Sequence, residues 1–335
     1  MDQKIDPDYY DRRAADARYM AGLADEQGWS AWARALRAKA GQIDINAAAR
    51  RADSPVVHYY ARLSIEAPGW TVESALAHRA GPGAPVWMSA GIGLNFAAMV
   101  ARMVERGDRI DGLQFADTGG ERPETYEALE WWSRWLIDHG YPPIVVVQYL
   151  IYGVDDLEGA CLRNETYPSL AFGRRGCSIK HKHQPMEHFR KAQNTGSEKP
   201  LILIGYDAGE GYRRSNITEN DFFKYCYPLI EWEWAREECR RYLLRRGLPV
   251  PGPSACYYCP AASRYDLEDL RAKHPTLALR TIAIEEGGHK TGAGHGLGGQ
   301  GRWLKPILTG KQIGLFPARR DEMPCGCYTG ERDLG

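Results

Sequence analysis

The stretch Val86-Trp-Met-Ser-Ala-Gly-Ile-Gly-Leu-Asn95 decides the fold expected for this chain. A short apolar run breaks into a turn with two glycines, and apolar residues then recur at helical spacing over residues 97–106. A second apolar run ends in Asp-Thr-Gly-Gly (117–120), and Pro123 stands in the first turn of the next helix, where its missing N–H costs little. This alternation predicts an α/β fold with a doubly wound, mostly parallel sheet.

Two loops at the ends of these strands carry candidate ligand contacts. Gly91 and Gly93 favour a sharp turn and a close approach of the backbone to a ligand, and the free amides of the following helix favour an anion. Asp117 and Thr118 follow the second strand, where open α/β sheets bind ligands. One Gly-x-Gly turn could equally be a structural bend, but two such loops on successive strands favour a binding site.

The rest of the chain divides into three predicted regions. Residues 1–80 are rich in Ala, Arg, Tyr and Trp at helical spacing, which predicts a helical cap or oligomerisation element. Residues 81–262 would form the nucleotide-binding domain, with further strands over 144–151 and 201–205. Residues 263–335 would form a small cysteine-containing C-terminal region, in which the glycine-rich segment 287–301 predicts a flexible loop or lid.

Composition excludes some classes of protein. Lys+Arg and Asp+Glu both number 43 in 335 residues, so no global positive charge indicates a nucleic-acid partner. No apolar run reaches the roughly 18 residues of a membrane span, and the N-terminus has no apolar signal region. We therefore expect a cytoplasmic protein without membrane contact. Its eight cysteines then favour metal, cluster or thiol chemistry over a disulfide framework.

The motif Cys256-Tyr-Tyr-Cys259 is the sharpest local signal for a metal. Two intervening residues let both thiolates reach one metal ion or one cluster edge. A redox pair or two buried thiols would have the same spacing. Cys226 and Cys239 are interpreted as small core residues, because free cysteine is often buried.

Three segments together resemble a known family. Ser89-Ala-Gly-Ile-Gly-Leu-Asn95, Phe115-Ala-Asp-Thr-Gly119 and Pro123-Glu-Thr-Tyr126 resemble the phosphoadenosine phosphosulfate (sulfonucleotide) reductases of the adenine-nucleotide alpha-hydrolase-like superfamily. That superfamily includes ATP pyrophosphatases and sulfur-inserting enzymes. The first loop departs from the pyrophosphatase form Ser-Gly-Gly-x-Asp-Ser, because it lacks the Asp and has Asn95 at the last Ser.

The resemblance extends from about residue 85 to 260 and implies an adenine-nucleotide site. Residues 173–185 resemble the family segment Cys-(Ser/Thr)-x-x-x-Lys-x-x-Pro, and residues 206–215 resemble its nucleotide element, although Tyr206-Asp207 stands where the family often has Arg. Guanidinium groups in that element would match phosphate or sulfate. The implied nucleotide contacts are Ser89, Gly91, Gly93, Asn95, Asp117, Thr118, Gly119, Lys180, Gly205, Arg213 and Arg214.

The resemblance also implies an iron–sulfur cluster. Cys177, Cys256 and Cys259 would hold a 4Fe–4S cluster, with zinc as the alternative metal. The cluster-bearing reductases have an adjacent Cys-Cys pair, whereas Gly176 precedes Cys177 here. A fourth ligand to the cluster would be Cys161, Cys325 or Cys327, or would be absent, and zinc could instead take His181 or His183.

The C-terminal sequence Glu322-Met-Pro-Cys-Gly-Cys327 resembles the reductases' catalytic tail. On this resemblance Cys325 attacks the sulfur of the bound sulfonucleotide, forming a protein thiosulfonate that a thioredoxin-like reductant then cleaves. The extra Cys327 could resolve that intermediate, or both tail cysteines could bind the cluster.

Three functions remain open at this point. The first is a sulfonucleotide reductase-like enzyme acting on adenosine phosphosulfate or its 3′-phosphate. The second is an ATP-dependent sulfurtransferase that modifies tRNA or DNA, with nucleic acid as its partner. The third is a nucleotide-binding protein without catalysis. A homo-oligomer is compatible with each of them.

Overall fold

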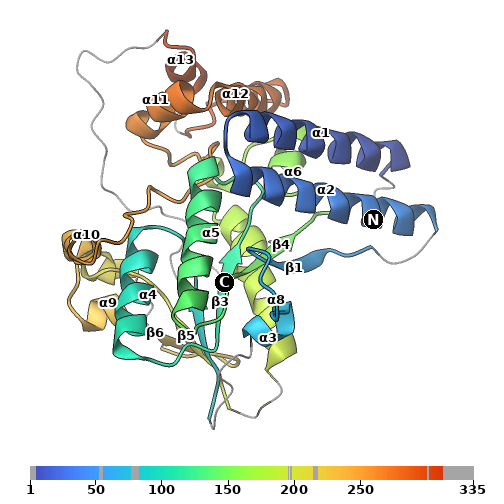
Figure 1. Cartoon of the computed structure of the whole chain (residues 1–335). Coiled ribbons are helices and arrows are strands. Elements are labelled where there is room, and N and C mark those ends of the chain that lie inside the picture. The colour runs from blue at the N-terminus through green and yellow to red at the C-terminus, as the bar shows by residue number, and fades with distance from the viewer. Residues whose placement is uncertain are drawn as a thin grey trace.

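Helices and a six-stranded, mostly parallel sheet make up the described part of the chain (Figure 1). The computed structural model describes residues 5–52, 56–76, 83–194, 196, 198–213, 218–299 and 302–311. The strands are β1 (Tyr59–Leu63), β2 (Val86–Ser89), β3 (Gly112–Ala116), β4 (Val145–Tyr149), β5 (Leu201–Leu203) and β6 (Lys224–Cys226). The expected α/β class is therefore confirmed, and the expected strands at β2 to β5 are present.

The sheet has the order β1-β4-β3-β2-β5-β6. Strands β2 to β6 run parallel, and only β1 among the described strands is antiparallel, paired with β4 at the edge. The chain moves outward from β2 through β3 to β4, then returns to the other side of β2 as β5. The order therefore reverses between β2 and β5, and crevices at such reversals are where open α/β sheets bind ligands.

Helices cover both faces of the sheet. On one face, α4 (Leu94–Arg106), α5 (Pro123–Asp138) and α10 (Arg236–Arg245) pack on an apolar layer that includes Leu113, Phe115 and Val146. On the other face, α3 (Val72–Leu76) and α8 (Gln184–Gln193) pack on Val145 and Val147. The three successive valines are buried on both faces, as expected for a strand inside a parallel sheet.

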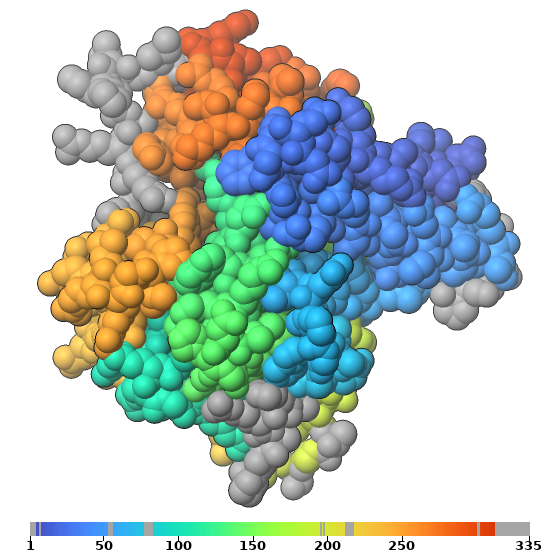
Figure 2. Space-filling view, viewed as in Figure 1, coloured from blue at the N-terminus to red at the C-terminus, as the bar shows by residue number. Residues whose placement is uncertain are grey.

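A helical hairpin forms most of the N-terminal region. Helices α1 (Pro7–Glu26) and α2 (Ser30–Arg51) pack along each other, and α2 also packs on α5. Figure 2 shows the hairpin joined to the rest of the surface, against α5 and the C-terminal helices. The helical expectation for this region holds, but residues 59–63 form a strand of the sheet instead of a helix.

The C-terminal part contains α11 (Arg264–Lys273), α12 (Pro275–Lys290) and α13 (Lys305–Leu308). The described part of the glycine-rich segment is packed, contrary to the expected flexible loop or lid. Its Leu297 is buried, and the Glu285 carboxylate accepts backbone N–H groups from Leu297, Leu304 and Lys305. A buried carboxylate satisfied by three backbone donors fixes this segment, because breaking those bonds would leave a charge without partners.

Short elements complete the described chain: α6 (Leu157–Arg163), α7 (Gly176–Ser178), α9 (Pro228–Glu231), the 3₁₀ turns η1 (Ser169–Phe172) and η3 (Ala208–Arg213), and the π-helical turn η2 (Ile179–His183). None of the described helices combines the length and the apolar character needed to cross a membrane.

Candidate functional site

The turn between β2 and α4 is strained at its centre. Ile92 has a φ of 55° and is only 1% exposed. A β-branched residue rarely adopts this left-handed backbone, and strain of this kind gathers at binding and catalytic sites. Gly91 and Gly93 flank it without a left-handed φ, and a Cβ added to either would meet nothing within 4 Å. The left-handed residue of the turn is therefore Ile92 and neither glycine, and the space beside both glycines is open.

Asn95, in the first turn of α4, connects this turn to the loop after β5. Its Nδ2 donates to Asp207 Oδ2 at 2.9 Å and to Glu210 Oε2 at 2.8 Å. Both carboxylates are buried, and Gly205 lies where a Cβ would come within 3.5 Å of the Phe96 amide nitrogen. The β2 and β5 loops thus lie together, but two acidic groups face the helix start where the sequence predicts an anion.

A second polar group lies beneath the turn, on the α8 face of the sheet. The Arg190 guanidinium donates to Ser89 Oγ at 3.0 Å. Gln114 is the register partner of Ser89 on β3 and is fully buried, and its amide oxygen and nitrogen have no hydrogen-bond partner among the described residues. Buried amides are normally satisfied, so this position has unused hydrogen-bonding capacity next to the turn.

The loop after β3 is held tightly. Asp117 accepts from the Tyr126 hydroxyl at 2.9 Å and from the Gly119 amide at 2.7 Å. Burial raises the pKa of Asp117, although Arg62 and the Gly119 hydrogen bond oppose the increase. Gly119 has a φ of 79°, and a Cβ there would lie 1.9 Å from the Asp156 carboxylate. Only glycine fits between this loop and the start of α6.

The Cys256-x-x-Cys259 loop docks onto the same segment. Tyr257 N donates to Gly120 O at 2.8 Å, and a Cβ on Gly120 would overlap the Tyr258 ring. Thr118 Oγ1 lies 3.0 Å from Cys256 Sγ. Two of the sequence-predicted features, the Asp-Thr-Gly-Gly loop and the cysteine motif, are therefore in direct contact.

Three cysteines lie in or against one apolar cluster with Tyr257 and Tyr258. Cys161 belongs to this cluster, and Cys177 and Cys256 pack against it. Burial raises the pKa of the Cys161 thiol, and the Cys177 thiol raises it further. No group of three or more His, Cys, Asp or Glu side chains in the described residues is arranged to hold a metal ion. Thiols are the ligand type that an iron–sulfur cluster requires, and three of them share one part of the fold. The described side chains are not arranged around a single metal position.

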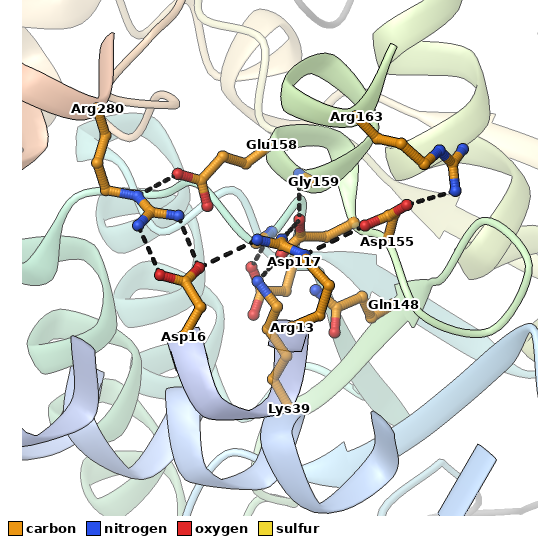
Figure 3. A network of polar contacts seen from close by, with 12 residues as sticks. Arg13, Asp16, Lys39, Asp117, Gln148, Asp155, Glu158, Gly159, Arg163 and Arg280 are labelled. Atoms are coloured by element: carbon orange, nitrogen blue, oxygen red, sulfur yellow. Dashed lines mark hydrogen bonds and ion pairs between the residues drawn. The ribbon is translucent and has the colours of Figure 1, made fainter. Parts of the chain in front are cut away.

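A buried ion network joins the N-terminal hairpin to the carboxyl end of the sheet (Figure 3). Arg13 of α1 contacts Asp16, Asp155 and Asp156, at 3.0, 3.2 and 3.6 Å. Lys39 of α2 forms a close ion pair with Asp156, and both side chains are buried. Arg163 also pairs with Asp155 at 2.5 Å, so three cations face three carboxylates, and such local balance is the condition under which buried ions are tolerated.

The network continues to α12. Arg280 binds Asp16 at 3.0 Å and Glu158 at 2.5 Å, and Glu158 also accepts from the Tyr257 hydroxyl. A cavity of about 10 Å³ beside these side chains and Gly119 has room for one water molecule. The hairpin is therefore packed closely over the β3 loop.

The remaining predicted site residues lie elsewhere or outside the described residues. Lys180 Nζ lies 5.3 Å from the centre of the Tyr149 ring, near the β1 edge of the sheet. Arg213 ends η3, but its side chain, like Arg214, Cys325 and Cys327, lies outside the described structure. His181, one of the two histidines named as possible zinc ligands, is buried, and burial lowers its pKa to about 4.

Several residues of the site are absent from the sequence-based prediction. Each of them bonds to a side chain that is far away in the chain: these residues are Arg190, Glu210, Lys39 and Asp156. Asp117 directly follows β3, and Asp155-Asp156 comes a few residues after the valine-rich strand β4. Acidic residues after a predicted strand were therefore the sequence signal that could have identified Asp156.

The chain matches no protein-family model, and comparison with curated proteins found no significant match. Assignment to the sulfonucleotide reductase family therefore stays a prediction from the motifs quoted above.

Proposed function

We propose that this chain binds an adenine nucleotide in the crevice between the β2–α4 turn and the loop after β5, as adenine-nucleotide alpha-hydrolase-like proteins do. The strained Ile92 carries the proposal, because it lies at the reversal of strand order between two glycines that face open space. A backbone without Cβ atoms at this position lets a phosphate or sulfate approach the free amides of α4.

Ser89, Asn95, Asp117, Thr118 and Gly119 would border the nucleotide. Lys180, Arg213 and Arg214 would balance its negative charge. Asp207 and Glu210 limit where that charge can lie, since they occupy the Asn95 side of the crevice. An anion would therefore sit on the side of Ser89 and Arg190, whose guanidinium provides a positive charge beneath the turn.

The proposed reaction is reduction of an adenine sulfonucleotide. The Cys325 thiolate attacks the sulfate sulfur, and the sulfur–oxygen bond to the nucleotide phosphate breaks, so that the nucleotide leaves with the electron pair. The product is a protein thiosulfonate. One thiolate of a thioredoxin-like dithiol then attacks Cys325 Sγ and releases sulfite, which leaves a mixed disulfide. The second thiol of the reductant breaks this mixed disulfide, frees the Cys325 thiolate and forms a disulfide within the reductant, so that the dithiol supplies both electrons.

An ATP-dependent sulfurtransferase acting on nucleic acid is the second candidate. The paired carboxylates of Asp207 and Glu210 favour it, since Mg²⁺ with ATP is commonly bound by one or two carboxylates together with the phosphates. Sulfite release from adenosine phosphosulfate with a dithiol supports the reductase, and pyrophosphate release from ATP with nucleic acid supports the transferase. Tight nucleotide binding with neither product would support a non-catalytic protein.

An iron–sulfur cluster at Cys177, Cys256 and Cys259 is part of the proposal. The apolar surroundings that Cys177 and Cys256 share, and the contact of Cys256 with Thr118, support it. When bound, a 4Fe–4S cluster would have an electrostatic and structural role rather than a redox role.

Replacing Gly91 by alanine separates binding from folding. We expect the free energy of unfolding to change by less than about 1 kcal/mol, because the Cβ enters open space and the φ of Gly91 is not left-handed. Nucleotide affinity should fall roughly 10- to 100-fold, because the methyl group blocks contacts with a charged ligand. Calorimetric titration with adenosine phosphosulfate and with ATP measures the affinity. If the ligand that wild type binds more tightly is bound equally well by the variant, the nucleotide does not bind beside Gly91.

Metal content tests the cluster directly. After anaerobic purification, we expect bound iron and sulfide in the wild type and their loss in Cys256→Ser. Cys226→Ser is the matched control, because Cys226 lies on β6, outside the cysteine cluster. Stoichiometric zinc, or metal equally retained in both variants, contradicts the iron–sulfur assignment at these cysteines.

A further inference from the structure

Four aromatic rings form an array at the carboxyl end of β4. In spatial order they are His188, Tyr59, Tyr149 and His58, and we call them the ring platform. Their centroids are 4.4 Å apart for His188 and Tyr59, 4.9 Å for Tyr59 and Tyr149, and 6.4 Å for Tyr149 and His58. The two histidines at the ends are exposed, and the two tyrosines are half-buried.

The platform is built by three separate elements. Tyr59 and Tyr149 are register partners in the antiparallel pair of β1 and β4, and His188 comes from α8. The interplanar angle between Tyr59 and His188 is 15°, so these rings are stacked. Tertiary structure thus holds exposed rings in place before any ligand binds, which reduces the entropy cost of binding.

Positive charge accompanies these rings. Lys180, on the π-helical turn η2, is exposed and lies 5.3 Å from the Tyr149 ring centre. The segment 173–183 that contains it also has Arg174 and Arg175 and no acidic residue, whereas its second lysine, Lys182, is buried and paired with Glu121. Nearby Glu187 on α8 is paired with Lys191 at 2.6 Å. Mid-helix π turns often occur at functional sites, and this one presents a cation beside the rings.

We infer that the ring platform and Lys180 bind single-stranded nucleic acid. Unpaired bases stack on aromatic side chains in a sequence-tolerant manner, while lysine and arginine contact the phosphates. A base can extend the array at His188 or at His58, because both terminal rings are exposed. A base-paired duplex has its bases already stacked and offers only its phosphates. The surface shares Lys180 with the proposed nucleotide site, but none of its four rings belongs to that site, so the histidine variants test the surface independently of nucleotide binding.

The test is fluorescence anisotropy of labelled single-stranded RNA and DNA of about 16 nucleotides with the full chain. We expect binding of single strands that exceeds binding of the matching duplex. The double variant His58→Ala/His188→Ala should bind roughly 5- to 100-fold more weakly than wild type. Lys180→Ala should lower the slope of log affinity against log salt by about one.

Controls keep the outcome interpretable. Tyr19→Ala removes a ring that is 65% exposed on α1, away from the ring platform, and should bind single strands like wild type. Because both substituted histidines are exposed, the double variant should retain the wild-type melting temperature. Equal binding by wild type and the double variant, no binding of either single strand at about 50 mM salt, or equal affinity for the duplex would each overturn the inference.

Discussion

Replacing Lys39 by methionine is expected to lower the free energy of unfolding by about 3–5 kcal/mol. The Asp156 side chain has 0% exposure, and Lys39, with 7%, forms a close ion pair with it. Methionine keeps the length of the side chain but removes the charge. Asp156 would then retain Arg13 at 3.6 Å and the Gly159 amide at 2.9 Å, which is too little for a fully buried carboxylate.

The matched control is an exposed ion pair between the same two helices. Arg18 and Asp44 also connect α1 to α2, with side-chain exposures of 52% and 46%. Arg18→Met should therefore cost less than about 1 kcal/mol. Urea unfolding of both variants measures the difference, and Lys39→Met/Asp156→Asn should recover part of the loss because no buried charge is left. Equal costs for the two single variants would show that burial of the Lys39 pair contributes nothing.

This pair also fixes the direction of one pH effect. Burial alone would raise the pKa of Asp156, but Lys39 and Arg13 outweigh it and hold the pKa below its usual value. The stabilisation is therefore fully present above the unfolded-state pKa of about 3.9 and is lost as pH falls through the lower folded-state pKa. In Lys39→Met the largest opposing charge is gone, so acid should destabilise the variant less than it destabilises wild type.

Local patterns were sufficient to predict the centre of the sheet. The three valines of β4 and the apolar run before Asp117 are buried on both faces. A continuous apolar run in the sequence predicts burial of that kind. The edge strand β1 was not predicted, because Tyr59-Tyr-Ala-Arg-Leu63 is half-buried along its length and mixes polar with apolar residues. Its position depends on pairing with β4, far away in the chain.

The roles of the glycines could not be predicted from the sequence. Gly91 and Gly93 are the obvious candidates for a left-handed turn, yet Ile92 has the positive φ and the glycines face open space. In the glycine-rich segment, the Glu285 carboxylate on α12 supplies the order that the local composition lacks. Both differences arise from contacts between distant segments, which no local pattern contains.

Gly119 gives the second large expected effect, since Gly119→Ala should lower the free energy of unfolding by about 2–5 kcal/mol. A left-handed φ costs a non-glycine residue about 1–2 kcal/mol, and overpacking adds about 1–3 kcal/mol. The overlap is with the Asp156 carboxylate, 1.9 Å from the new Cβ, and not with a flexible surface group. If Asp156 shifts to relieve the overlap, the substitution also disturbs its buried ion pair with Lys39.

Gly107→Ala separates the two contributions. Gly107 ends α4 with a φ of 69°, close to the 79° of Gly119, but a Cβ there would meet nothing within 4 Å. Its substitution should therefore cost only the backbone term of about 1–2 kcal/mol. If urea unfolding gives the same loss for both variants, the β3 loop can move away from α6, and the close packing of the hairpin over Gly119 is adjustable. A larger loss for Gly119→Ala means that the loop is fixed between Asp156 and Tyr258, so any ligand at Asp117 must fit a site that is already formed.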